Sequence, residues 1–203
     1  MAAAKPTGPT MRISSTAAHE AGHILASSYF GNMPTLSTIE PGPGYRGRTS
    51  YDNCPPAHQA PAHVIIKALA PEREAPGEPA RNEIWREGSR ESAICSLAGP
   101  LAEAIHLRED VHDVLDRNRS DRAAARAAID QFVIVSEARV AAFNYLLREA
   151  ECLVRQRWRV ITALAEALET HRKLTGPQIG LIIRETVTEA ARSRWGNCDQ
   201  LDE

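Results

Sequence analysis

Two histidines and a glutamate form the pattern in this sequence that has the clearest chemical meaning. His19-Glu20-Ala21-Gly22-His23 is an H-E-x-x-H motif inside a stretch of helix-forming residues. Residues four apart lie on one face of a helix, about 5 to 6 Å apart, so both imidazoles can reach one metal ion. Glu20 projects from an adjacent part of that face, where it can take a proton from a water molecule that the metal has acidified. The motif therefore predicts a hydrolytic zinc site.

The alternative is that these three side chains are ordinary residues on a helix surface. It is disfavoured, because two buried histidines flanking a carboxylate are costly to place without a cation. Gly22 lies between the histidines, and glycine costs roughly 1 kcal/mol in a helix interior. We therefore expect another backbone segment to approach the helix at Gly22, although simple helix packing would also explain this residue.

A catalytic zinc ion usually has three protein ligands and one open position, so the motif needs a third ligand. The residues after His23 are apolar or small and contain no third histidine of the extended H-E-x-x-H-x-x-G-x-x-H pattern. A carboxylate on a later helix is the other option, and spacing alone does not choose among Glu103, Asp113, Asp116 and Asp121.

The motif helix is expected to span Ala17 to Phe30, because hydroxyls at residues 14–16 can cap its start and Gly31-Asn32 can end it. Thr35 to Ile39 alternates with period two, and Arg48 to Tyr51 can return antiparallel after a glycine turn. We therefore expect a small sheet of two or three strands beside this helix.

Most of the remaining sequence has helical patterning, so the expected fold class is mainly α. Residues 71–88 are charged and contain Pro and Gly, which indicates an exposed loop or insertion. Gly99-Pro100 should bend or split the helix expected at residues 91–107. The other expected helices cover residues 120–135, residues 136–171 with a break near 155–159, and residues from Thr175-Gly176-Pro177-Gln178 to about 191.

Composition bounds the classes of function. The 203 residues carry a net charge of −2, which offers no basic stripe for nucleic acid. No apolar stretch approaches the roughly 18 residues of a membrane span, and residues 1–13 lack the apolar core of a secretory signal. The four cysteines form no C-x-x-C pair. We expect a cytoplasmic protein with a leader at 1–13, one domain at 14–192 and a tail at 193–203.

Beyond the motif, several segments resemble the peptidase domain of FtsH-type ATP-dependent zinc proteases. The resemblance covers most of the sequence between Ser14 and Glu185. Its segments are Ala18 to His23, Thr38-Ile39-Glu40-Pro41 before a glycine turn, Ser96 to Ile105 (SLAGPLAEAI), Ser120-Asp121 before an Ala-rich helix, Leu164 to Leu168, and Leu174-Thr175-Gly176. It implies a helical zincin-type metallopeptidase domain with a small hairpin or sheet beside the H-E-x-x-H helix.

Carried over by position, the resemblance implies that His19 and His23 bind zinc, that Glu20 is the general base and that Asp121 is the third ligand. The family has S-N-D where this sequence has Asn118-Arg119-Ser120-Asp121. Glu103 is expected either to hydrogen-bond a metal ligand or to pack a helix.

Proteins of the FtsH type also carry an ATPase module. Gly42 to Thr49 imitates a phosphate-binding loop, but Arg48 replaces the essential Lys and a strand is expected to follow. We therefore expect a zinc endopeptidase that cuts unfolded or extended polypeptides. An ATPase partner acting in trans and a homo-oligomer are both possible and stay open. The alternatives are a catalytically degenerate zinc-stabilised protein-binding module, which the intact Glu20 argues against, and a metallohydrolase for small substrates.

Overall fold

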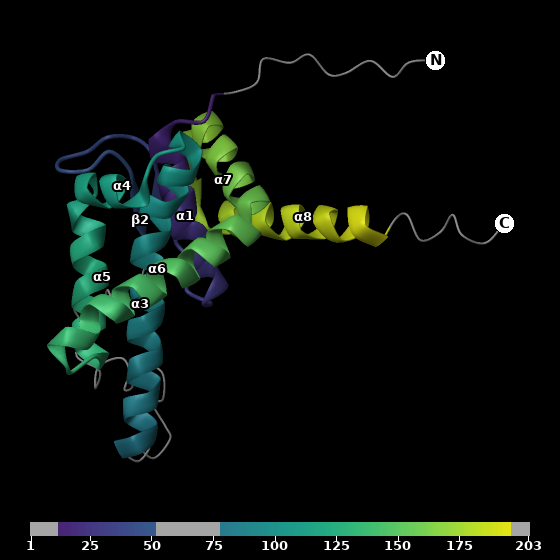
Figure 1. Cartoon of the computed structure of the whole chain (residues 1–203). Coiled ribbons are helices and arrows are strands. Elements are labelled where there is room, and N and C mark those ends of the chain that lie inside the picture. The colour runs from purple at the N-terminus through teal and green to yellow at the C-terminus, as the bar shows by residue number, and fades with distance from the viewer. Residues whose placement is uncertain (1–11, 52–77, 196–203) are drawn as a thin grey trace, which may run out of the picture.

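The computed structural model describes residues 12–51 and 78–195, and this part of the chain is mainly helical with one small sheet (Figure 1). The predicted mainly α fold is confirmed at this level. Its helices are α1 (Ser15–Tyr29), α3 (Glu78–Leu107), α4 (Val111–Arg117), α5 (Arg119–Phe132), α6 (Ser136–Gln156), α7 (Trp158–His171) and α8 (Gly176–Trp195). Its strands are β1 (Leu36–Thr38), β2 (Arg48–Ser50) and β3 (Lys173–Thr175).

The motif helix α1 forms as expected. The Ser14 side chain caps it by accepting a hydrogen bond from the backbone N–H of Ala17, and Gly31 follows its end with a positive φ of 83°. The N-cap and glycine stop explain why the sequence located this helix to within about two residues.

The core forms where α3 packs against α1 on one side and against α5 on another. Ile24 of α1 and Leu97 of α3 are fully buried there. A Cβ atom at Gly22 would lie 2.4 Å from the carbonyl oxygen of Ala98, so only glycine permits this close approach of α1 and α3. The expected approach of a second backbone segment at Gly22 is confirmed.

Helix α3 is longer and more regular than predicted. It runs through Pro100 as one helix, so the expected split at Gly99-Pro100 does not occur. Proline costs about 3 kcal/mol inside a helix. Burial of Leu97, Ala98 and Leu101 around it favours the continuous helix by more than this cost.

The predicted loop at residues 71–88 is also wrong from residue 78 onward, because residues 78–88 form the first turns of α3. Pro79 stands in the first turn, where its missing N–H would have had no helical partner. The charged residues that suggested a loop are equally compatible with an exposed helix face. Residues 71–77 lie outside the described residues.

The long helical pattern between residues 136 and 171 divides into α6 and α7, with the break at Arg157 as predicted. Helix α8 continues to Trp195, so residues 193–195 of the expected tail are helical. The expected leader falls largely on residues 1–11 and the rest of the expected tail on residues 196–203, both outside the described residues. Figure 1 shows α8 projecting away from the other helices.

Helix α4 was not expected. The Asp110 side chain caps its start by accepting a hydrogen bond from the backbone N–H of His112 at 2.8 Å. Helix α4 ends at Asn118, where the chain turns directly into α5. This short helix therefore determines where α5 begins, and with it the position of the Asp121 carboxylate in the first turn of α5.

The sheet has the strand order β2-β1-β3, and both strand pairs are antiparallel. The hairpin of β1 and β2 agrees with the prediction. The third strand comes from residues far along the sequence, because the chain leaves α7 through Arg172, which has a left-handed φ of 61°. The register places Ser37 opposite Thr49 on one side and opposite Leu174 on the other.

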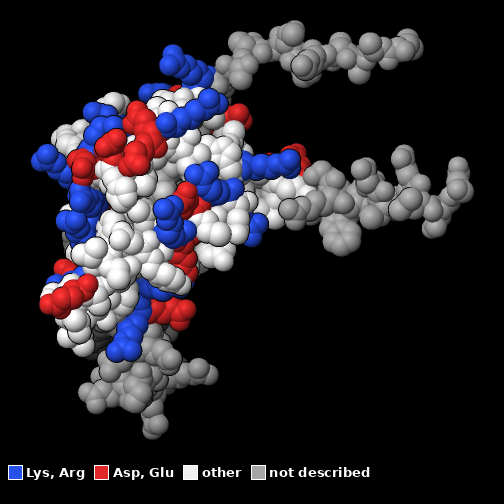
Figure 2. Space-filling view, viewed as in Figure 1, with Lys and Arg blue, Asp and Glu red and all other residues white. Residues whose placement is uncertain are grey.

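The surface of the described residues offers two further observations. None of their helices has the length and apolar character needed to cross a membrane. Figure 2 shows Lys and Arg side chains interspersed with Asp and Glu over the face in view, with neither sign gathered into a continuous stripe. This face therefore has a mixed charge pattern.

Candidate metal centre

The two motif histidines lie side by side on the face of α1 that meets α3 and α5. Their ring centroids are 4.7 Å apart, and their Nε2 atoms are 3.0 Å apart. Their side chains are only 12% and 16% exposed. The i,i+4 spacing thus brings both imidazoles to one partly buried point, as the sequence predicted.

The other ring nitrogen of each histidine has a partner on α3. Nδ1 of His19 lies 3.0 Å from Oε2 of Glu103, and Nδ1 of His23 lies 2.9 Å from the carbonyl oxygen of Cys95. A carboxylate and a carbonyl are both acceptors, so each Nδ1 carries the proton. Each Nε2 therefore faces the space between the rings, which is the ring orientation found in metal-binding histidines.

Asp121 completes the cluster from the first turn of α5. Its Oδ2 lies 3.3 Å from Nε2 of His19, and its Oδ1 lies 3.7 Å from Nε2 of His23. The N-terminal end of a helix favours a charged carboxylate, which is the form that binds a metal. The structure therefore brings Asp121 beside both histidines, and its role as the third metal ligand stays a prediction.

Glu103 of α3 and Asn118 at the end of α4 support this cluster through hydrogen bonds. Oε2 of Glu103 accepts a hydrogen bond from the Asn118 side-chain amide at 2.8 Å, in addition to its contact with His19. The same amide also donates to the Val114 carbonyl at the end of α4. Of the two roles expected for Glu103, the structure shows the hydrogen bond to His19.

The carboxylates change the proton affinity of His19. Burial lowers the pKa of His19, but its hydrogen bonds to Asp121 and Glu103 and their negative charges outweigh burial and raise the pKa to about 9. Burial raises the pKa of Asp121 and of Glu103, yet their contacts with His19 reverse this and lower both values. In the absence of an ion, one proton on His19 thus provides the positive charge that this site favours.

The donor set fits a zinc ion. One ligand atom from each of His19, His23 and Asp121 can be chosen so that all lie within 4.8 Å of one another. Tetrahedral zinc with bonds of about 2.0 to 2.1 Å holds its ligand atoms roughly 3.3 Å apart, close to the three separations above. No other group of three His, Cys, Asp or Glu side chains meets this limit in the part of the chain that the structure describes.

Close packing against α3 also shapes the site. A Cβ atom on Gly99 would lie 2.3 Å from Nε2 of His23, so the imidazole occupies the space that any other residue would fill. Pro100 follows immediately, and both residues are buried. The Gly99-Pro100 pair, which had suggested a broken helix, instead belongs to the wall of the histidine site.

Glu20 follows His19 in α1 and contacts the sheet, whereas the histidines contact α3 and α5. It is only 4% exposed, and its Oε2 accepts a hydrogen bond from the Thr49 hydroxyl of β2 at 2.7 Å. Its negative charge is close enough to contribute to the raised pKa of His19. Glu20 is thus a buried carboxylate beside the candidate metal site that touches the sheet.

The other carboxylates considered as third ligands lie elsewhere. Asp113 and Asp116 are exposed on α4, and Asp116 forms an ion pair with Arg122. The structure therefore brings Asp121 to the histidines and leaves these two out of the cluster. Sequence reasoning missed Thr49 and Asn118, because a single polar residue in a strand or at a helix boundary has no recognisable spacing.

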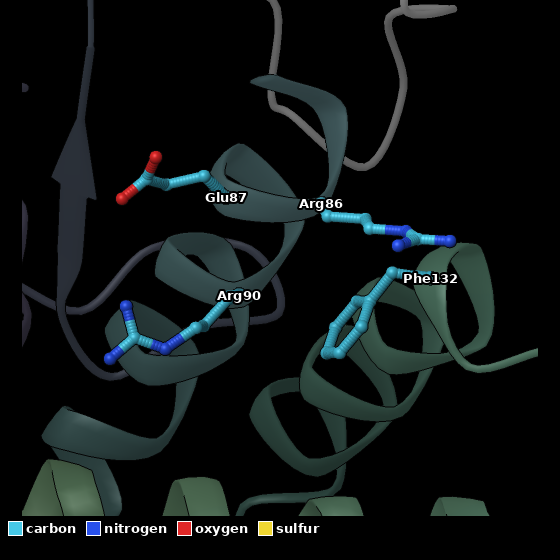
Figure 3. A pocket seen from close by; sticks show the side chains of 4 residues that line it. All are labelled: Arg86, Glu87, Arg90 and Phe132. Atoms are coloured by element: carbon cyan, nitrogen blue, oxygen red, sulfur yellow. The ribbon is translucent and has the colours of Figure 1, made fainter. Parts of the chain in front are cut away.

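A separate shallow hollow lies toward the start of α3, lined by Arg86, Glu87, Arg90 and Phe132 (Figure 3). Three of these side chains come from α3, and the Phe132 ring comes from the end of α5. Arg90 is already paired with Glu149 of α6. The four described residues that line the hollow include neither a histidine nor a nucleophilic side chain, so they offer no counterpart to the α1 cluster.

Comparison with protein-family models and with curated proteins finds no match for this chain. The similarity to FtsH-type peptidases therefore rests on the motifs of the sequence. The cluster of histidines and carboxylates is the observation from which a function can be argued.

Proposed function

We propose that this protein is a zinc-dependent endopeptidase with an FtsH-like, zincin-type peptidase domain. The observation that carries the proposal is the convergence of His19, His23 and Asp121, with the buried carboxylate of Glu20 alongside. Two imidazoles, one carboxylate and a nearby non-ligand carboxylate form the donor set of hydrolytic zinc enzymes. The motif resemblance to FtsH-type peptidases supports the same reading.

In this proposal His19, His23 and Asp121 hold the ion, and Glu103 and the Cys95 carbonyl orient the two imidazoles. A bound zinc ion supplies Lewis acidity, which polarises the scissile carbonyl and lowers the pKa of a water molecule. Glu20 accepts the proton of that water on its carboxylate. It then delivers the proton to the leaving amine, so the same carboxylate acts first as base and then as acid.

The small sheet suggests how a polypeptide substrate binds. Among the described residues, strand β2 pairs only with β1 and is the outermost strand on that side of the sheet. An extended peptide can add to such an edge through backbone hydrogen bonds, which favours unfolded or extended substrates over folded ones. Thr49 of β2 contacts Glu20, so this strand lies next to the proposed base.

The proposed function also includes a cellular location, a cofactor, a class of substrate and a partner. We place it in the cytoplasm, with zinc as its cofactor and polypeptides as its substrates. Folded substrates need an unfolding activity, and an ATPase partner acting in trans would supply it. We expect the chain by itself to cut an unfolded protein without ATP and to leave a stable folded protein intact.

The test combines metal content with cleavage of a fluorescently labelled unfolded protein. We expect one zinc per chain, cleavage that a chelator abolishes and added zinc restores, and no effect of ATP. Glu20→Gln should keep zinc but lose at least about 1000-fold in turnover, since it removes the proton acceptor. Glu166→Gln, at an exposed position on α7, is the matched control and should retain activity.

Each result against the proposal points to a particular alternative. Stoichiometric zinc without cleavage of any polypeptide would favour a zinc-stabilised protein-binding module. Full activity of Glu20→Gln would move the base elsewhere. Hydrolysis of small esters or amides but not of polypeptides would favour a small-substrate metallohydrolase.

A further inference from the structure

The core-facing row across the sheet contains two hydroxyl groups where apolar side chains would be expected. Ser37 in the central strand stands opposite Thr49 of β2 and Leu174 of β3. Leu174 and Ser37 are both 0% exposed, and Thr49 is partly buried. Burying a hydroxyl is unfavourable unless it is hydrogen-bonded, so the partners of these two groups explain why they are tolerated.

The hydroxyls form a chain that ends on Glu20. Oγ1 of Thr49 lies 2.7 Å from Oε2 of Glu20, and Oγ of Ser37 lies 3.0 Å from Oγ1 of Thr49. A carboxylate can only accept, so Thr49 must donate its single proton to Glu20. Ser37 must then donate to Thr49. The direction of both hydrogen bonds is therefore determined.

The second oxygen of Glu20 is confined by backbone. A Cβ atom at Gly47 would lie 2.7 Å from Oε1 of Glu20 and 2.8 Å from its Cγ. The chain entering β2 thus closes against one side of the carboxylate while the Thr49 hydroxyl holds the other. Because Glu20 is 4% exposed, little water competes for these contacts.

We infer that Thr49 is a positioning residue for the base Glu20, and that Ser37 orients the Thr49 hydroxyl. This inference rests on the proposed function. Thr49 holds the carboxylate at one rotamer, and it does so from the strand whose free edge would bind the substrate. A base held at a fixed distance from the reacting water gains rate in the chemical step, whereas loose positioning by about 1 Å is costly.

The experiment separates this role from a structural one by measuring kcat and KM on an unfolded polypeptide, with zinc content determined in parallel. Thr49→Val keeps the shape and strand preference but removes the donor. Hydrogen bonds to charged groups make the expected loss in kcat roughly 10- to 100-fold, with KM within about twofold and one zinc per chain. Thr49→Ser restores the hydroxyl and should recover kcat to within about threefold.

Two further variants complete the test. Ser37→Ala should lower kcat less than Thr49→Val, because Thr49 keeps its own donor. In a Glu20→Gln background, Thr49→Val should add no further loss. Unchanged kcat in Thr49→Val, or equal impairment of Thr49→Ser and Thr49→Val, overturns the inference.

Glu20→Gln distinguishes failure of the inference from failure of the proposed function. If Glu20→Gln is inactive while Thr49→Val is fully active, only the role of Thr49 is wrong. If Glu20→Gln is fully active, or the wild-type chain cuts no polypeptide, the proposed function falls and the inference falls with it.

Discussion

The two functional sides of α1 are supported in different ways. Toward α3 and α5, His19 and His23 meet carboxylates and a backbone carbonyl, which are acceptors that favour positive charge between the rings. Toward the sheet, Glu20 meets the hydroxyl of Thr49, which donates a hydrogen bond to the carboxylate. One helix thus separates a site suited to a cation from a site suited to a base.

This difference implies that metal binding and turnover can be perturbed separately. The groups that orient the histidines come from α3, whereas those that hold Glu20 come from β2 and the segment before it. A change on the α3 and α5 side should act first on zinc affinity. A change on the sheet side should act on the chemical step of a protein that still binds zinc.

Asp121→Ala gives the largest expected effect on the metal side. It removes one of three proposed ligands and leaves two, so we expect zinc content after dialysis to fall from one per chain to below about 0.1 and cleavage to be lost. Metal analysis together with the cleavage assay measures both. Asp113→Ala and Asp116→Ala, at exposed positions on α4, should keep zinc and activity. Full zinc retention in Asp121→Ala would remove Asp121 from the ligand set.

The raised pKa of His19 predicts that the stability of the metal-free protein depends on pH. His19 changes from its ordinary value of 6.5 in the unfolded chain to about 9 in the folded, metal-free protein. Because the folded value is higher, its stabilisation is complete below pH 6.5 and is lost as pH rises through 9. The loss should be on the order of 3 kcal/mol. Thermal unfolding in the presence of chelator at pH 6.5 and pH 9 measures it.

Zinc must displace the same proton, because only a neutral imidazole binds a metal. Zinc affinity should therefore rise with pH up to about 9, and binding at pH 7 should release about one proton from His19. Titration calorimetry in two buffers of different ionisation enthalpy gives the number released. Zinc binding at pH 7 without proton release would contradict the raised pKa.

Gly99 packs beside the histidines and Gly47 beside Glu20, so substitutions at these two glycines compare the two sides of α1 directly. A Cβ at Gly99 would press on His23, and one at Gly47 would press on Glu20. We expect Gly99→Ala to lower zinc affinity and to destabilise the protein by about 1 to 3 kcal/mol. Gly47→Ala should instead lower kcat while zinc content stays at one per chain. Equal effects of both variants on zinc content would show that the two sides are not separable.

Gly88 provides the matched control for these substitutions. It lies in α3, and a Cβ there would meet nothing within 4 Å. Gly88→Ala should therefore raise the free energy of unfolding by about 0.5 to 1 kcal/mol through helix propensity alone, with zinc content and kcat unchanged. Denaturant unfolding measures this smallest effect.

Local signals determined much of the fold. The Ser14 cap and Gly31 stop located α1, the alternation of β1 and β2 located the hairpin, and the helical spacing around Arg157 located the break between α6 and α7. These features depend on residues close in sequence. The start of α3 and the possible split at Gly99-Pro100 were predicted wrongly, because burial against distant helices outweighs local preference.

The sequence by itself also determined that His19 and His23 share a face, since the helical period leaves no other outcome. It left four carboxylates open as the third ligand. The tertiary structure brings Asp121 to the histidines, because the α4 to α5 turn places the first turn of α5 beside them and leaves Asp113 and Asp116 exposed.

The partners of Glu20 and Glu103 were likewise decided by tertiary structure alone. Thr49 is 29 residues from Glu20, and Asn118 is 15 residues from Glu103. Hydrogen bonds between such residues depend on strand register and helix packing, and a single polar residue in the sequence does not show which distant residue it will meet. Spacing along one helix could therefore identify the motif that points to a metal, whereas the supporting residues Thr49 and Asn118 became identifiable only when separate elements packed together.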